Sequence, residues 1–126
     1  MTKGICTAAG LLLAILALTY SCTKGSQDVL SGGATCDTVG MQYTANVVPI
    51  LQENCYSCHG TGNTAGSGGI LLEGFANIKP YATNGQLVGN VTHAPGYVPM
   101  PYGLPKLPDC EVNTIVDWVN NGAQNN

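Results

Sequence analysis

Arginine is absent from this 126-residue chain, and charged residues of all kinds make up only 9% of it. Four lysines stand against seven acidic residues, so the net charge is -3 and there is no basic patch with which to bind nucleic acid. The lack of arginine also removes the side chain best suited to bidentate recognition of phosphate. No Ser/His/Asp set and no phosphate-binding loop is present, so these enzyme classes are not supported.

The chain also lacks an apolar run of the roughly 20 residues that a membrane-spanning helix needs. The longest run begins at Ala8, follows the positive charge of Lys3 and is about 13 residues long. Residues 1–21 are therefore predicted to be a signal peptide. The letters LTYSC at residues 18–22 resemble a bacterial lipobox and predict lipidation of Cys22, with simple cleavage or an uncleaved anchor as the alternatives. We expect export to the periplasm or the cell surface, with lipid on Cys22 as the membrane anchor.

Two segments follow the expected signal peptide. Residues 22–35 are rich in Ser, Gly and Thr without an apolar period, which predicts a flexible tether. Residues 36–126 are predicted to form one folded domain of about the modal domain size. The 17 glycines and 7 prolines of the chain indicate that this domain is rich in loops.

Helical spacing of apolar residues predicts three helices in an all-α domain. The first covers residues 44–56, and the regular part is expected to begin near Asn46 or Val47 because Pro49 is tolerated only in a first turn. A short helix is expected over residues 73–81, ended by Pro80 and the Asn84-Gly85 turn. The last covers residues 109–121 and should pack its apolar stripe against the first, with Trp118 beside the stripe, which consists of Val112, Ile115, Val116 and Val119.

The most informative stretch is the CxxCH motif at residues 55–59, which is a signature of covalent c-type haem attachment. If the motif forms a helical turn, Cys55 and Cys58 lie on one face, where each sulfur can add to a haem vinyl group. His59 can then take the proximal position on the iron. The alternative to haem attachment is a disulfide or a zinc site within the motif, since CxxC occurs in both.

A second stretch, residues 91–103, offers the ligand for the other side of the iron. Pro99 and Pro101 flank Met100 and stiffen the backbone around its thioether. A methionine is often core filler, but beside a CxxCH motif it can serve as the distal ligand and favour the reduced metal. His93 is the rival ligand and would give a bis-histidine site of lower potential.

These motifs together resemble the small single-haem cytochrome c domains of bacterial exported proteins. The resemblance covers about the last 90 residues and runs from VPIL at residues 48–51 through CYSCHG, Met100-Pro101 and CEV to DWV and NGA at the carboxyl end. It implies a class I cytochrome c fold, in which amino- and carboxyl-terminal helices cross and a loop-rich middle surrounds one covalent haem. It also implies thioether bonds at Cys55 and Cys58, His59 as the proximal ligand and Met100 as the distal ligand.

The six cysteines of the chain can then be assigned to separate roles. Cys6 falls in the signal peptide, Cys22 in the lipobox and two in the haem motif. The remaining Cys36 and Cys110 are predicted to form a disulfide in an oxidising compartment. Two buried free thiols are the alternative.

The expected function follows from an iron with both axial positions filled by the protein. Such a haem has no open position for substrate, so we expect an exported electron carrier rather than an enzyme. Its partners would be redox proteins, met transiently or within an assembly, and few charges favour docking through an apolar haem-edge patch. The alternatives are a gas sensor or peroxidase-like enzyme with a displaceable Met100, or a subunit of a larger respiratory or extracellular electron-conducting assembly.

Overall fold

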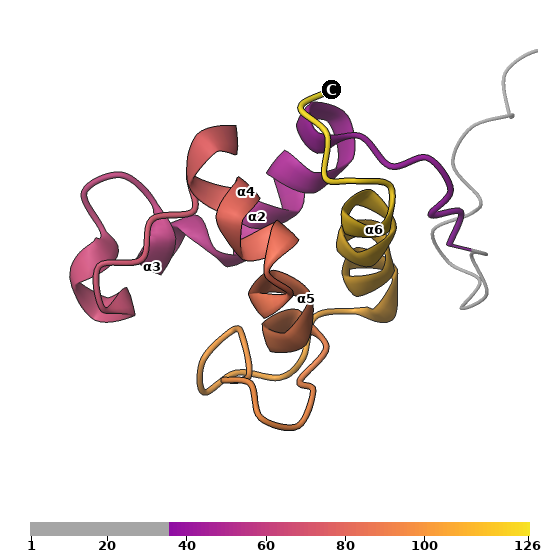
Figure 1. The fold of residues 1–126 in the computed structure, drawn as a ribbon. Helices are drawn as coiled ribbons and strands as arrows, with labels where there is room; N and C mark the ends of the chain where they lie inside the picture. The colour runs from indigo at the N-terminus through magenta and orange to yellow at the C-terminus, as the bar shows by residue number, and fades with distance from the viewer. Residues whose placement is uncertain (1–35) are drawn as a thin grey trace, which may run out of the picture. The chain divides into compact units, whose positions relative to one another are not determined.

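The structure is a computed structural model that describes residues 36–126 (Figure 1). Seven helical segments and no strand occur within these residues, so the all-α prediction is confirmed. None of the helices described there has the length and hydropathy needed to cross a bilayer. The expected signal peptide (1–21), the lipidation site Cys22 and the tether (22–35) lie outside the described residues.

The first helical stretch has three parts, η2 (Tyr43–Val47), α2 (Val48–Asn54) and α3 (Tyr56–His59). The predicted helix is thus present, and it extends to the end of the CxxCH motif with a break at Cys55. Pro49 lies in the first turn of α2, where its missing amide proton is tolerated. The chain before it forms a wide π-helical turn, so helical structure begins a few residues earlier than expected.

The middle of the domain contains η3 (Thr64–Ser67), α4 (Phe75–Thr83) and α5 (Gln86–Val91). The expected Asn84-Gly85 turn does end α4, whose carboxyl cap is Asn84, but the prediction that Pro80 also ends the helix is wrong, because the helix continues through it to Thr83. Ile78 and Ala82, on either side of the proline, are both buried, and this packing outweighs the missing hydrogen bond. After α5, residues 92–108 form a long connection, here named the Met100 loop, which projects at the lower edge of Figure 1.

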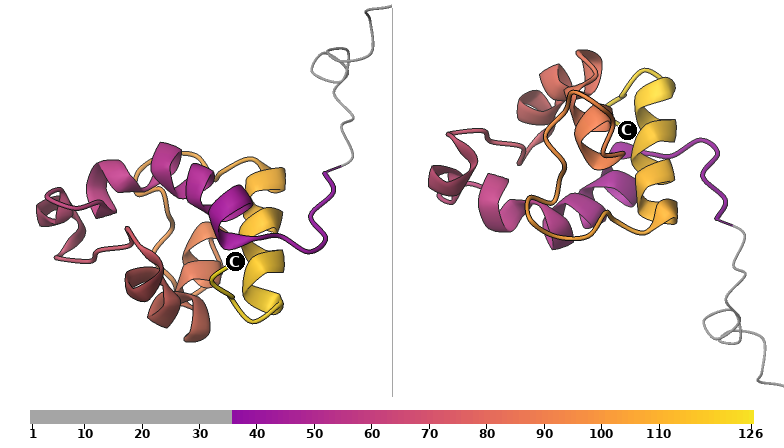
Figure 2. Two further views of the ribbon diagram at one scale, coloured as in Figure 1. Left: turned by 90° about the horizontal axis from the view of Figure 1, so that it is seen from above. Right: turned by 90° about the horizontal axis from the view of Figure 1, so that it is seen from below.

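The last helix, α6 (Asp109–Asn120), agrees with the predicted range to within one residue. Figure 2 shows it lying across the start of the first helical stretch, where it packs on η2. Trp118 is 1% exposed and lies at the centre of this contact, with its ring centroid 5.4 Å from that of Tyr43. The expected packing of the first and last helices is therefore present, but Trp118 has the central position rather than Val116 or Val119, which are half-buried.

The core is one contiguous cluster of buried side chains drawn from every helix except the short α3 and η3, together with two residues from loops and one from the carboxyl tail. Burial of such side chains from water is the main stabilising term for a domain of this size. The members of the cluster are Tyr43, Val47, Leu51, Leu72, Ile78, Ala82, Leu87, Val91, Leu107, Val112, Ile115, Trp118 and Ala123.

The carboxyl tail after α6 folds back and satisfies polar groups on three elements. Asn126 accepts hydrogen bonds from the amides of Tyr43 and Thr44 at 2.8 and 2.9 Å, which caps the start of η2. The indole nitrogen of Trp118 donates to the carbonyl of Gln124 at 2.9 Å. The ammonium of Lys79, from α4, donates to two carbonyls of the tail.

Replacing Lys79 with Met is expected to lower the free energy of unfolding by about 1–3 kcal/mol, as for other hydrogen bonds to charged groups. The ammonium lies 2.6 Å from the Gly122 carbonyl and 2.7 Å from the Ala123 carbonyl, and the substitution removes both contacts. Lys106→Met is the matched control, because Lys106 pairs only with Asp109 at a surface where the two side chains are 41% and 85% exposed. Its effect should stay below about 1 kcal/mol. Urea titrations measure the free energy of unfolding of both variants, and equal losses would contradict the role of Lys79 in holding the carboxyl tail.

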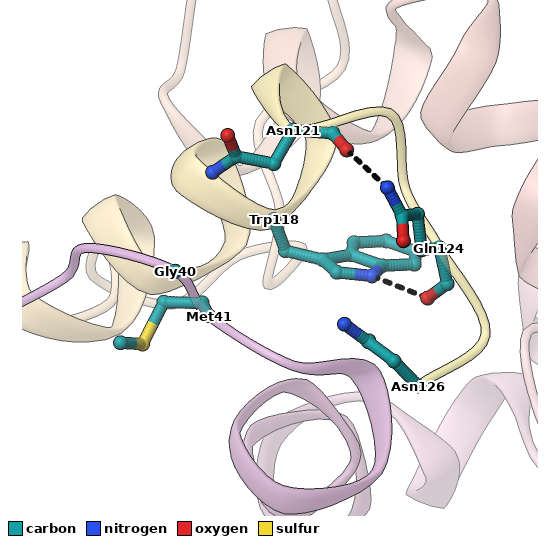
Figure 3. Close-up of a pocket in the computed structure, with 6 residues that line it drawn as sticks. All are labelled: Gly40, Met41, Trp118, Asn121, Gln124 and Asn126. Atoms are coloured by element: carbon teal, nitrogen blue, oxygen red, sulfur yellow. Dashed lines mark hydrogen bonds between the residues drawn. The ribbon is translucent and has the colours of Figure 1, made fainter.

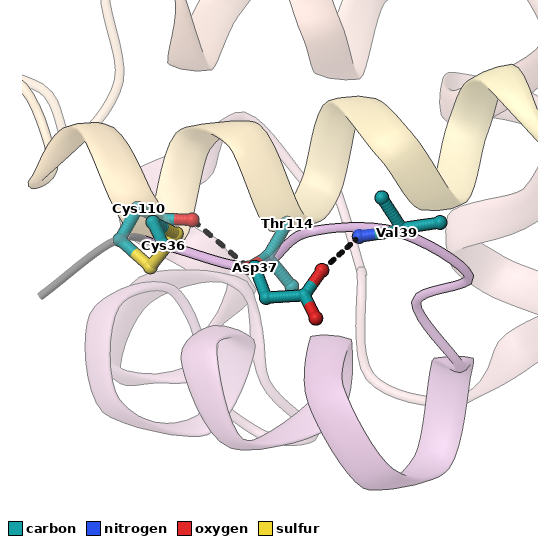
Figure 4. The surroundings of a disulfide bond; sticks show 5 residues. All are labelled: Cys36, Asp37, Val39, Cys110 and Thr114. Atoms are coloured by element: carbon teal, nitrogen blue, oxygen red, sulfur yellow. Dashed lines mark hydrogen bonds between the residues drawn. A yellow bond between two sulfur atoms is a disulfide. The ribbon is translucent and has the colours of Figure 1, made fainter.

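A disulfide joins Cys36 to Cys110, as predicted (Figure 4). Cys110 lies in the first turn of α6, where its carbonyl accepts a hydrogen bond from Thr114. Cys36 is the first residue of the described domain, and the short segment after it carries Val39, which is 83% exposed. The bridge therefore ties a poorly packed segment to the last helix.

Candidate haem site

The CxxCH motif forms the helical turn that haem attachment requires. The carbonyl of Cys55 accepts hydrogen bonds from the amides of Cys58 and His59, at 3.1 and 2.8 Å. Gly60 ends α3 in an extended conformation, and a side chain there would collide with the carbonyl of Tyr56. The two cysteines and the histidine of the motif thus lie within one helical turn of the backbone.

Both cysteines of the motif are free thiols in the structure, so the motif does not form its own disulfide. Cys58 is exposed, whereas Cys55 is half-buried. Burial, helped by the carboxylate of Glu111, raises the pKa of the Cys55 thiol to about 11. A redox-active CxxC pair depends on a lowered thiol pKa, so this environment does not favour thioredoxin-like chemistry. Within residues 36–126, no three Cys, His, Asp or Glu side chains gather as a zinc site would require.

His59 is held in one orientation by the segment that follows the glycine-rich loop. The imidazole is 9% exposed, and its Nδ1 lies 3.0 Å from the carbonyl oxygen of Ile70. A carbonyl can only accept, so Nδ1 donates this hydrogen bond and Nε2 is the ring nitrogen left to bind a metal. Nε2 has no hydrogen-bond partner among the described residues. Every fully buried side-chain nitrogen or oxygen of these residues does have a partner, so Nε2 is not fully buried and remains accessible. An imidazole fixed through a hydrogen bond from Nδ1 is the usual arrangement of a metal-ligating histidine.

Met100 and His93 lie together in the Met100 loop. The amide of Met100 donates to the carbonyl of Asn90 at 3.0 Å, and Nε2 of His93 donates to the carbonyl of Met100 at the same distance. His93 has a φ of 57°, which is uncommon for a residue other than glycine. Because its Nε2 is engaged with the loop backbone, His93 serves here to hold Met100 rather than to offer that nitrogen to a metal.

The two groups of candidate ligands come from separate parts of the domain. The thiols and His59 lie at the end of the first helical stretch, and Met100 lies in the loop between α5 and α6. No hydrogen bond between described residues joins the motif directly to Met100 or His93. Four large apolar side chains of the Met100 loop are strongly exposed, namely Tyr97 (42%), Val98 (51%), Tyr102 (78%) and Leu104 (65%).

A small cavity at the other end of the first helical stretch has a different character (Figure 3). It has a volume of about 90 Å³, and Gly40, Met41 and Trp118 line it together with polar residues of the carboxyl tail. Pockets that hold ligands of drug size are several times larger, on the order of 300 Å³ or more. Met41 lines this cavity, at the end of the first helical stretch away from the CxxCH motif.

The sequence did not predict the main-chain groups that orient the candidate ligands. The carbonyl of Ile70 holds His59, and the carbonyl of Asn90 holds Met100. Side-chain motifs carry no signal for such contacts. The five glycines between residues 60 and 69 were the only hint, because they allow the chain to turn back towards the histidine.

The fold and the site cannot be assigned through relatives. Comparison of the chain with protein-family models, with curated proteins and with solved structures finds no match. The function is therefore argued from the thiols, the imidazole and the thioether themselves.

Proposed function

We propose that this protein is an exported mono-haem c-type cytochrome that carries single electrons between redox partners. The observation that carries the proposal is the anchored imidazole of His59. Its Nδ1–H is committed to Ile70 and its Nε2 is available, in the same helical turn as two free thiols. Neither a structural disulfide nor a zinc site explains this combination.

The donor set fits covalent haem. Cys55 and Cys58 supply the two thiols for the thioether bonds, and Nε2 of His59 supplies the proximal nitrogen. Met100 supplies a thioether as the distal ligand, held through its own amide and carbonyl groups. Bound there, the haem would supply reversible one-electron exchange at its iron. The contribution of the chain is to hold the imidazole in one tautomer and to restrict the Met100 backbone.

A class I cytochrome c fold is the finer form of this proposal. The contact of α6 with η2 supports it, since packing of the first and last helices is what the resemblance implies. The placement of Met100 in a loop directly before the last helix also supports it. The order of motif, loop and final helix is then that of a domain wrapped around one haem.

The exposed apolar side chains of the Met100 loop support docking to a redox partner. They flank the proposed distal ligand in the sequence, and a group of large apolar side chains exposed in one segment supports a surface that a cofactor or partner covers. Only two lysines, Lys79 and Lys106, occur within residues 36–126, so strong electrostatic steering is not expected. Lipid on Cys22 would keep the domain at a membrane while it meets its partners.

The test is a pyridine haemochrome spectrum of the full chain produced together with haem-attachment machinery. The wild type is expected to give the spectrum of haem bound through two thioether links and to keep its haem under denaturing conditions. Changing Cys55 to Ser should leave one link and shift the spectrum towards that of a vinyl haem, whereas changing Cys36 to Ser should not. Failure of the wild type to retain any covalent haem would refute the proposal.

A further inference from the structure

The most informative feature is the carbonyl of Ile70, because it contacts two side chains. Nδ1 of His59 lies 3.0 Å from this oxygen, and the hydroxyl oxygen of Ser67 lies 3.0 Å from it as well. A carbonyl oxygen has two lone pairs, so both groups can donate to it at once.

The hydroxyl of Ser67 has a second possible acceptor, the carbonyl of Thr64 at 3.0 Å. That carbonyl already accepts the amide protons of Gly68 and Gly69, which occupy its two lone pairs. The Ile70 carbonyl has only the His59 ring as its other donor. The single hydroxyl proton of Ser67 is therefore better donated to the carbonyl of Ile70.

We infer that Ser67 is a positioning residue that tunes the iron ligand His59 through their shared acceptor, the carbonyl of Ile70. The inference rests on the proposed function and deepens it. A second donor draws electron density from the carbonyl and weakens its pull on the Nδ1–H of His59. The imidazole then donates less strongly through Nε2, and a weaker donor disfavours the oxidised iron. Ser67 thus raises the reduction potential of the bound haem.

The geometry also explains why this serine lies where it does. Ser67 is the last residue of η3 and is half-buried, while the glycines that follow it bring the chain to Ile70 within three residues. The amide of Leu72 donates to the carbonyl of His59 at 2.8 Å, so the same segment is tied to the histidine by main chain as well as by side chain. Loss of the hydroxyl therefore leaves the imidazole anchored.

The test measures the reduction potential of the haem-loaded full chain in the wild type and in four single variants. Ser67→Ala is expected to shift the potential to a more negative value, equivalent to about a three- to tenfold change in the one-electron equilibrium constant, where tenfold is about 59 mV. Ser67→Val should do the same, and Ser67→Thr, which has the shape of Val but keeps a hydroxyl, should retain the wild-type potential. Thr83→Ala is the matched control, because the Thr83 hydroxyl also bonds two main-chain carbonyls but lies in α4. It should leave the potential unchanged.

A second readout follows the histidine directly. In the reduced, diamagnetic protein, the Nδ1 proton of His59 should move downfield in Ser67→Ala and Ser67→Val, as expected for a stronger hydrogen bond. Equal potentials and equal Nδ1–H shifts in the Thr and Val variants would overturn the inference while leaving the proposed function intact. If the wild type holds no covalent haem in the haemochrome assay, the proposed function fails and this inference fails with it.

Discussion

Replacing Met100 with Ala is expected to lower the reduction potential of the haem-loaded protein by on the order of a few tenths of a volt, since axial ligands set this property over a wide range. A thioether favours the reduced metal, so its loss favours the oxidised form. The far-red band that methionine gives on ferric iron should disappear with the substitution. The reduced variant should also bind carbon monoxide rapidly, because one axial position is open. Spectroelectrochemical titration and carbon monoxide mixing measure these effects.

His93→Ala is the matched control for this prediction. Its Nε2 donates to the carbonyl of Met100, so the substitution removes a contact that holds the loop but not the proposed ligand. The far-red band should persist, with a smaller shift in potential than in Met100→Ala. If Met100→Ala keeps the wild-type spectrum and His93→Ala loses low-spin character, the iron is ligated by His59 and His93, and the Met100 assignment is wrong.

The same measurements separate the proposed carrier from the alternative functions. A gas sensor or peroxidase-like enzyme needs a displaceable Met100, so its wild-type reduced form would bind carbon monoxide as rapidly as Met100→Ala does. A subunit of a larger assembly requires a different measurement, the native mass of the isolated protein, which would exceed that of one chain if the chain assembles. A closed, six-coordinate and monomeric protein is the result expected here.

Features that depend on local sequence could be predicted. The apolar stripe of α6 predicted its range because helical spacing persists over three turns. The Cys36–Cys110 bridge could be predicted because a separate role was expected for every other cysteine. The helix that leads into the CxxCH motif could be predicted from its apolar spacing. Each of these signals is carried by side chains a few residues apart, or by the count of one rare residue type.

Features that depend on distant parts of the chain could not be predicted. Pro80 looked like a helix end because nothing local shows that Ile78 and Ala82 are both buried. The start of η2 is capped by Asn126, more than 80 residues away in sequence. The orientation of His59 depends on a main-chain carbonyl, which every residue possesses and no motif identifies. The proposal of haem attachment therefore rests on the motif, whereas the main-chain groups around the proposed ligands could be identified only from the fold.

Removal of the Cys36–Cys110 disulfide is expected to have the largest effect on stability. The bridge joins residues 74 positions apart, and a loop of that length corresponds to about 4 kcal/mol in the chain-entropy model. The double variant Cys36→Ser/Cys110→Ser should lose up to this amount of unfolding free energy in urea titrations. Its m-value should rise, because the unfolded chain without the bridge exposes more surface.

The wild type and the double variant together provide the control. Addition of reductant should bring the wild type to the stability of the double variant and leave the double variant unchanged, since Cys110 is exposed and its side chain contributes little packing. Alkylation without reductant should label neither Cys36 nor Cys110 in the denatured wild type. Labelling of both would show two free thiols and contradict the bridge. Because Val39, three residues after Cys36, is 83% exposed, the segment from Cys36 to Tyr43 should lose its amide protection first when the bridge is removed.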